Sequence, residues 1–175
     1  MKALILCGGR GTRLGKLTDK HQKVMLDVGG KPFLSYLVSK LVKKYTLHYA
    51  LGFKAEEVIK HFSLGKVEHY INTESQLSAI NEYAAKCQSL DFMAINGDTF
   101  LFDYDYANGY SVVVPDHNQG VIAAGIYYVM SGRQYKTVSE LLCIENFLHV
   151  HHGPWVDIGS PEGLQYARNH IEDLK

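Results

Sequence analysis

The feature that most constrains this chain lies at its N-terminus, where an apolar run over residues 3–7 leads directly into the glycine-rich stretch GGRGTRL, residues 8–14. The apolar run is typical of a buried strand, and the glycines allow the following backbone to approach a ligand closely. Such a turn offers several N–H groups to a phosphate chain, and Arg13 adds a charged fork for phosphate oxygens. The pattern predicts nucleotide chemistry.

Two familiar phosphate-binding loops do not fit this stretch. A Walker A loop needs a glycine five residues before its Gly-Lys pair and Ser or Thr after it, whereas Gly15-Lys16 has Arg10 upstream and Leu17 downstream. A dinucleotide fingerprint starting at Gly9 would place Leu14 where the third glycine belongs. Both are therefore excluded by spacing.

Composition sets the outer bounds. A chain of 175 residues predicts one domain, residues 1–175, with a single substantial core. The 18 basic and 18 acidic residues balance, which gives no electrostatic case for nucleic acid or an anionic membrane. No apolar run approaches the roughly 18 residues that span a bilayer, and no signal-peptide pattern opens the chain. The three cysteines, Cys7, Cys87 and Cys143, fit buried thiols and a cytoplasmic protein.

Hydrophobic periodicity predicts alternating strands and helices. The expected strands are 3–7, 46–51, 67–71, 92–95, 111–114, 121–129 and 155–158, and the expected helices are 33–45, 55–62, 78–87, 138–147 and 160–174. This order indicates an α/β fold with a doubly wound, mostly parallel sheet. Such sheets bind ligands at the carboxyl ends of their strands, so the glycine-rich stretch and the Asp98 turn should converge on one crevice.

Several motifs together resemble one family. The stretch Gly8–Leu14 is followed in register by Lys23 and by Gly30-Lys31-Pro32, and the chain also carries Asn96–Phe100 (NGDTF) and Trp155–Gly159 (WVDIG). This combination resembles the sugar-phosphate nucleotidylyltransferases, which have a Rossmann-like nucleotidyltransferase fold. Within that family the chain looks like a shortened form of the guanylyltransferases that act on heptose 1-phosphate. Gln22 stands where the family usually has proline.

The resemblance implies a reaction in which a phosphomonoester attacks the α-phosphorus of a nucleoside triphosphate, pyrophosphate leaves, and Mg²⁺ assists. It implies metal binding by Asp98 and Asp157, and catalytic roles for Arg13 and Lys23. The implied nucleotide-binding residues are Leu6, Gly8, Gly9, Gly11, Thr12, Arg13, Gln76, Ser78 and Asp98. The implied acceptor-binding residues are Lys23, Gly125, Tyr127 and Glu140. Residues 1–100 would form the nucleotide-binding half and 101–175 a reduced acceptor-binding half.

Simpler roles compete for some of these positions. Asp98 could complete an Asx turn and Asp157 could cap the helix that follows it. Glu140 suits the first turn of a helix, where an acid complements the dipole. His149, His151 and His152 form a cluster, but they lack cysteine or carboxylate partners at metal-ligand spacing and fit exposed loop histidines better than a zinc site.

Two departures from the family limit the substrate assignment. Residues 73–80 contain no glycine where the family carries Leu-Gly-Thr-Gly-Gly-Ala, so Gln76 and Ser78 would replace bare backbone, somewhat as in choline-phosphate cytidylyltransferases. Residues 101–120 form only a short connection where the family inserts strands that wall the acceptor pocket. A second copy of the chain could complete that pocket, a hypothesis that a fully active monomer would refute.

The sequence therefore favours a guanylyltransferase on heptose 1-phosphate that serves surface polysaccharide synthesis. The first alternative is a cytidylyltransferase acting on a small non-sugar phosphomonoester. The alternative from another class is a non-catalytic nucleotide-binding subunit, but a pure binder has little need for two metal carboxylates together with Arg13 and Lys23.

Overall fold

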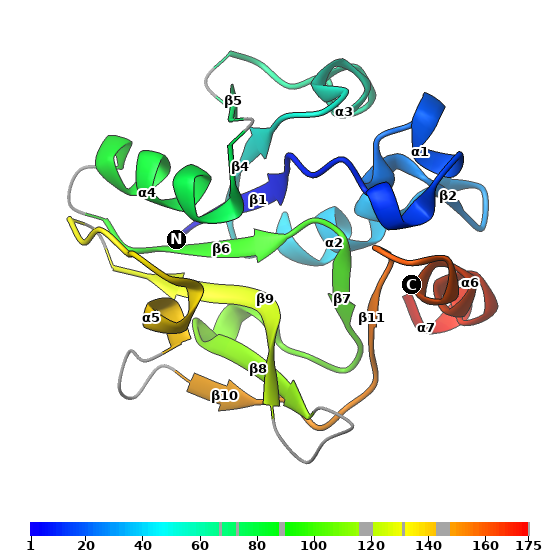
Figure 1. Ribbon diagram of the computed structural model, residues 1–175. Helices are drawn as coiled ribbons and strands as arrows, with labels where there is room; N and C mark the ends of the chain where they lie inside the picture. Colours follow the sequence, from blue (N-terminus) through cyan, green and yellow to red (C-terminus); the bar gives the residue numbers. More distant parts are fainter. Residues whose placement is uncertain are drawn as a thin grey trace.

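The structure is a computed structural model that describes residues 1–66, 68–72, 74–87, 90–115, 121–130, 132–142 and 148–174. Its centre is a seven-stranded sheet in the order β10-β8-β9-β6-β1-β4-β5 (Figure 1). The strands span β1 (Lys2–Cys7), β4 (Thr46–Leu51), β5 (His69–Ile71), β6 (Phe92–Asn96), β8 (Ser111–Pro115), β9 (Val121–Val129) and β10 (Leu148–Val150).

The strand directions confirm the predicted doubly wound sheet. β1 pairs in parallel with both β4 and β6, and β4 pairs in parallel with β5. β9 runs antiparallel to β6 and β8, while β10 is parallel to β8. The chain therefore winds outward from β1 in one direction to β4 and β5, and in the other to β6. Ligand crevices form at such a switch point, beyond the carboxyl ends of β1 and β6.

Helices cover both faces of this sheet, because alternate residues of β1 point to opposite sides. Ala3 and Ile5 belong to the core that includes α2 (Phe33–Leu41) and α3 (Ala55–Phe62), whereas Leu4 belongs to the core that includes α4 (Gln76–Lys86) and α5 (Val138–Leu142). The β1 residues Ala3, Leu4 and Ile5 are fully buried, which explains why β1 reads as a continuous apolar run.

Two small antiparallel pairs carry the chain around the carboxyl edge of the sheet. One pairs β2 (Asp27–Val28) with β3 (Lys31–Pro32), and the other pairs β7 (Thr99–Leu101) with β11 (Trp155–Asp157). The remaining elements of the described residues are the helix α6 (Pro161–Asn169) and the short helical turns η1 (Thr12–Leu14), α1 (Leu17–Lys20), η2 (Lys23–Met25), η3 (Tyr106–Asn108) and α7 (Ile171–Leu174).

Some predicted element boundaries were wrong. The helix predicted over 33–45 ends at Leu41, because the N–H groups of Lys44 and Tyr45 both donate to the Leu41 carbonyl and turn the chain toward β4. The helix predicted over 160–174 breaks at His170, whose ring stacks on Tyr166 with centroids 4.0 Å apart. The short strands β2, β3, β7 and β10 were not predicted.

Other predictions fall partly outside the described residues. Val67, at the start of the strand predicted over 67–71, lies outside them, as do residues 143–147 of the helix predicted over 138–147, and Thr73. Cys7 and Cys87 are buried free thiols, as predicted, and Cys143 lies outside the described residues.

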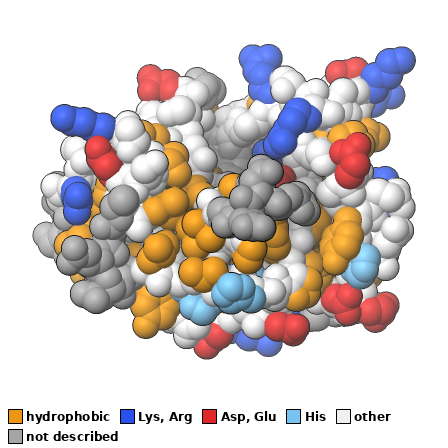
Figure 2. Space-filling model, turned by 60° about the horizontal axis from the view of Figure 1, so that its bottom comes forward, with side chains coloured by type: hydrophobic (Ala, Val, Ile, Leu, Met, Phe, Trp, Pro, Cys, Tyr) orange, Lys and Arg blue, Asp and Glu red, His pale blue; other side chains and the backbone are white. Residues whose placement is uncertain are grey.

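The second half of the chain leaves apolar side chains on the surface. Val121 and Ile122 on β9 and Leu148 on β10 are 56%, 42% and 48% exposed. Figure 2 shows hydrophobic side chains gathered on the face that lies at the bottom of Figure 1. Within the described ranges, none of the helices has the length and apolar character required to cross a bilayer.

Candidate functional site

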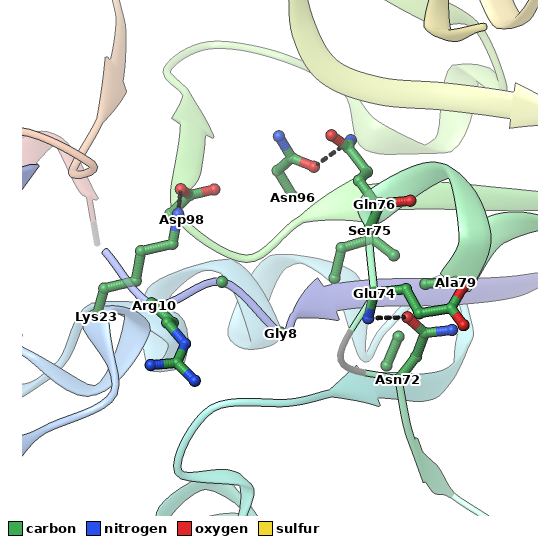
Figure 3. Close-up of a pocket in the computed structure, with 13 residues that line it drawn as sticks. Gly8, Arg10, Lys23, Asn72, Glu74, Ser75, Gln76, Ala79, Asn96 and Asp98 are labelled. Atoms are coloured by element: carbon green, nitrogen blue, oxygen red, sulfur yellow. Dashed lines mark hydrogen bonds and ion pairs between the residues drawn. The ribbon is translucent and has the colours of Figure 1, made fainter. Parts of the chain in front are cut away.

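A cleft of about 450 Å³ opens at the switch point between β1 and β6 (Figure 3). Six residues predicted from the sequence line it, namely Leu6, Gly8, Gly9, Lys23, Gln76 and Asp98. They come from four separate parts of the chain: the end of β1, the η2 turn, the start of α4 and the turn after β6. The predicted convergence of the glycine-rich stretch with the Asp98 turn is therefore confirmed.

The N-terminus of α4 forms one wall of the cleft. Ser75 caps the helix, and its hydroxyl accepts a hydrogen bond from the Ser78 N–H at 3.1 Å. This cap holds the first turn of α4 so that the Gln76 amide donates to Asn96 Oδ1 at 2.7 Å, across the cleft from α4 to β6 (Figure 3). Two side-chain amides thus face the ligand space, and amides can pair with the edge of a nucleobase.

Ser78 points elsewhere. Its hydroxyl donates to Glu74 at 2.6 Å and accepts from Asn72 at 3.2 Å, and it does not line the cleft. The Asn72 amide also donates to Glu82 at 2.9 Å, and the Glu74 N–H donates to Asn72 Oδ1 at 3.1 Å. The role of Ser78 in this structure is to brace Asn72 and Glu74, which do line the cleft.

Gly125 and Tyr127 lie on β9 directly behind the amide pair. Gly125 has φ +72°, and a Cβ there would lie 2.5 Å from Asn96 Nδ2, so only glycine lets β9 pass this close. Tyr127 is buried and pairs with Ala94 of β6. Burial raises the pKa of Tyr127, and a hydrogen bond with Gln76 acts in the opposite direction. Both residues support Asn96 and Gln76 from behind rather than lining the cleft.

Lys23 connects the glycine-rich stretch to the Asp98 turn. Its side chain passes alongside Gly9, and its ammonium forms an ion pair with Asp98 (Figure 3). The two side chains are 17% and 9% exposed, so water screens the pair weakly. A positive charge is thereby held at the carboxyl end of the sheet, beside the space where phosphates would lie.

The β7–β11 pair brings Asp157 beside Asp98. Asp157 pairs with Thr99, and the Ile158 N–H donates to the Asp98 carbonyl at 2.9 Å. Burial raises the pKa of Asp157, and repulsion from Asp98 raises it further. Three groups lower the pKa of Asp157. The Gly159 N–H donates a hydrogen bond to its carboxylate at 2.6 Å, and Lys23 and Arg13 place positive charges near it. Two carboxylates from distant parts of the chain thus repel one another at one place.

This donor set fits a hard divalent cation. Two hard carboxylate groups converge, and a cation between them would relieve their repulsion. Among the described residues, no group of three or more His, Cys, Asp and Glu side chains could hold a metal ion. Mg²⁺ in particular is commonly bound by one or two carboxylates, with substrate phosphates and water completing the shell. Asp98 and Asp157 would supply the protein's share.

Arg13 is not in the wall of this cleft. Its guanidinium lies beside Gly159, 2.8 Å from where a Cβ would stand there, and it lines a second cavity of about 500 Å³. Asp157 lines that cavity too, with Trp155, Tyr166 and Glu162. The two carboxylates therefore stand between two cavities, with Lys23 on one side and Arg13 on the other. Gly11 and Thr12 lie at the η1 turn, outside the wall of the first cleft.

The structure does not bring Glu140 to either cavity. Its carboxylate accepts from the Lys136 N–H at 2.8 Å and its own N–H pairs with the Thr137 hydroxyl at 3.3 Å, so it stabilises the first turn of α5. The neighbouring Leu141 carbonyl accepts from Ser111 at the start of β8. Glu140 thus belongs to the helix that packs on β8 and β9, and it lines neither of the two cavities.

Sequence reasoning missed several lining residues: Arg10, Ala50, Asn72, Glu74, Ser75, Ala79 and Asn96. Two of them carried a usable signal. Asn96 directly precedes Gly97-Asp98 at a strand end, and Ser75 has the residue type of a helix cap. Asn72 and Ala50 carried none, because their place depends on how β4 and β5 pair beside β1.

A glycine on α6 holds Asp157 in place. A Cβ at Gly163 would lie 1.8 Å from the Asp157 carbonyl oxygen, so Gly163→Ala must push α6 away from β11. We expect a loss of about 1–3 kcal/mol in the free energy of unfolding, as overpacking typically costs. Thermal unfolding measures it, with Gln165→Ala on the exposed face of α6 as the control. A variant as stable as the control would contradict this packing.

The model of one protein family matches this chain. The family is the MobA-like NTP transferase domain, and the match covers residues 3–142. A curated relative is the "Bifunctional protein GlmU" of Methanococcus maripaludis, 33% identical over 137 residues. That match covers 71% of this chain and 33% of the relative, so the chain spans about a third of the length of the curated relatives that it matches.

Two solved structures share the fold. A putative glucose-1-phosphate thymidylyltransferase from Bacillus anthracis superposes with a TM-score of 0.75 at 18% identity, covering 100% of this chain and 96% of that one. HddC from Yersinia pseudotuberculosis, complexed with GMP-PN, superposes with a TM-score of 0.69 at 24% identity, covering 97% and 99%. Their likeness extends over the whole α/β architecture and so includes the strand ends that carry the cleft.

Proposed function

Because the chain belongs to the family of MobA-like NTP transferase domains, we propose that it transfers a nucleoside monophosphate from a nucleoside triphosphate to a sugar 1-phosphate, with release of pyrophosphate. The observation that carries this proposal is the grouping of Lys23, Asp98 and Asp157 at the edge of the cleft. A transfer between two anions depends on positioning and charge neutralisation, and this group offers both.

The residues of the two cavities have distinct roles in this proposal. The N–H groups of the glycine-rich stretch and Lys23 bind phosphate oxygens, and Gln76 and Asn96 pair with the base. Arg13 lines the second cavity together with Asp157, and there it would bind the phosphate group of the acceptor. Asp98 and Asp157 would hold Mg²⁺, which when bound neutralises charge on the reacting phosphates.

For the base and the acceptor, the proposal follows the sequence resemblance: guanosine triphosphate and heptose 1-phosphate, for surface polysaccharide precursors. HddC, which shares the fold, is a protein complexed with GMP-PN. The exposed Glu74 carboxylate at the cleft could accept hydrogen bonds from the amino and imino groups of guanine. A cytoplasmic location and an acceptor site completed by a second copy stay predictions.

One observation favours the alternative acceptor, a small non-sugar phosphomonoester. The second cavity combines the aromatic rings of Trp155 and Tyr166 with Glu162, next to Arg13. Aromatic faces and a carboxylate attract a cationic group, and an arginine attracts its phosphate. The non-catalytic subunit is less well supported, because binding alone does not require a buried carboxylate (Asp98) and a half-buried one (Asp157) that repel each other.

Thermal unfolding with Mg²⁺ and each of GTP, CTP, UTP, ATP and dTTP tests the proposal. A nucleotide at about 100 times its dissociation constant adds roughly 2.7 kcal/mol. Each kcal/mol raises the midpoint by about 2–4 °C at this size. We expect GTP to give the largest rise. A rise with CTP alone would support the alternative, and pyrophosphate release with the matching phosphomonoester then identifies the acceptor.

No rise with any nucleotide would contradict the proposal. Mg²⁺ alone and each nucleotide with a chelator are the controls, because they separate the effect of the metal from that of the base.

A further inference from the structure

Gln22 is a fully buried polar residue next to Lys23 that the proposed chemistry does not use. Its side-chain amide donates to the Cys7 carbonyl at 2.5 Å and reaches the Gly9 carbonyl at 3.4 Å. Its side-chain oxygen accepts from the Val24 N–H at 2.6 Å. One side chain therefore joins the end of β1, the glycine-rich stretch and the η2 turn.

The backbone of Gln22 is held as well. Its N–H donates to the Glu57 carboxylate on α3 at 2.6 Å, and the other oxygen of Glu57 pairs with His21 at 2.7 Å. The residues on both sides of Lys23 are therefore held in place. Gln22 is held by its hydrogen bonds to Cys7, Gly9, Val24 and Glu57, and Val24 is held by its bond to Gln22 and by its burial. Lys23 extends from this braced turn along Gly9 to Asp98 (Figure 3).

We propose that Gln22 is a positioning residue, which locks the η2 turn to the glycine-rich stretch so that the Lys23 ammonium is held at the phosphate site. This role rests on the proposed function insofar as it concerns catalysis. The physical argument is geometric: a long lysine side chain has many rotamers, and it delivers charge to one place only if its backbone is fixed. A buried side-chain amide whose hydrogen bonds are all satisfied restrains the backbone in this way.

Gln22→Met tests the proposal by keeping the length of the side chain and removing its hydrogen bonds. The amide hydrogen of Val24 loses its acceptor and should exchange faster with solvent. Lys23 should become several-fold more reactive toward acetic anhydride, measured by mass spectrometry relative to exposed Lys20 in the same sample. Gln165→Met, at an exposed glutamine bonded to Asn169, is the matched control.

These two readouts do not depend on any reaction. If Lys23 reactivity and Val24 exchange in Gln22→Met equal those of the wild type, the proposal is overturned whatever the protein catalyses. If both change while the wild type binds no nucleotide, the positioning geometry stands and the proposed function fails. In a working enzyme we expect kcat to fall by roughly 10²-fold, the cost of misplacing a reacting group by about an ångström.

Gln22→Glu separates positioning from a merely structural role. An ionised carboxylate cannot donate to the Cys7 carbonyl, whereas a protonated one can, and burial among carbonyl oxygens raises the pKa of such a carboxyl. Its activity relative to wild type should therefore recover as the pH falls from 8 to 6, while that of Gln22→Met should not. The ionisable groups that face this side chain are Glu57, His21, Lys23 and Cys7, and all four are present in the wild type and in both variants. A flat ratio would overturn the proposal.

Discussion

Asp98→Asn is expected to reduce Mg²⁺-dependent pyrophosphate release by about 10²–10³-fold, the range found when a group that stabilises transition-state charge is removed. Asparagine keeps the shape of the side chain but removes the charge that would hold Mg²⁺ and that pairs with Lys23. The fold should survive, because the variant also removes the repulsion between Asp98 and Asp157. Pyrophosphate release over a series of Mg²⁺ concentrations measures the effect.

Asp105→Asn is the matched control for this variant. Asp105 also pairs with a lysine, Lys44, but on the exposed η3 turn. Removing that carboxylate should leave turnover unchanged. Normal turnover in Asp98→Asn, with the same dependence on Mg²⁺ as the wild type, would show that Asp98 is not a metal ligand.

Lys23→Met should lower kcat/KM for the phosphomonoester by roughly 10²-fold, while the affinity for the nucleotide falls much less. The glycine-rich N–H groups and the Gln76–Asn96 pair still hold the nucleotide in this variant. The phosphate of the phosphomonoester, however, loses the cation that would reduce its repulsion from the α-phosphate of the nucleotide. Steady-state kinetics with the phosphomonoester varied, together with nucleotide binding by calorimetry, separates the two quantities.

The same variant leaves Asp98 and Asp157 without their lysine. Lys23 favours the charged form of Asp157, so its removal increases the repulsion that Mg²⁺ would relieve. Mg²⁺ should therefore raise the unfolding midpoint of Lys23→Met more than that of the wild type or of Lys44→Met. Equal losses of phosphomonoester use and nucleotide binding would assign Lys23 to the nucleotide alone.

The predictable part of the fold depends on local pattern. The apolar run of β1 and the periodic stripes of α3 and α4 predicted their elements, because one face of each must be buried. Helix ends were less predictable. The stripe predicted over 33–45 continues past Leu41, yet the chain turns there because Thr46 must pair beside Lys2 in β4. That constraint arises from strand pairing in the sheet, so the hydrophobic periodicity of residues 33–45 does not reveal it.

The candidate site divides in the same way. Asp98 could be placed from the sequence, because it follows a buried strand that ends at the carboxyl edge of the sheet, and Lys23 could be placed through the family resemblance. Glu140 could not, because its helix, α5, packs on β8 and β9 and its carboxylate bonds within its own first turn, so it lines neither cavity. Nor could the separation of Arg13 from the first cleft, which depends on where β11 places Asp157 and Gly159.

By itself, the sequence determined the order of the longer strands and helices, the glycine-rich turn after β1 and the polar residues that follow buried strands. Each of these features depends on residues that are close together in the chain. Only the tertiary structure decided which of those residues share a cavity. The β7–β11 pairing sets Asp157 beside Asp98, and Gln22 ties Lys23 to the end of β1. These contacts join segments distant along the chain, and their geometry follows from strand register and packing, which local residue patterns do not encode.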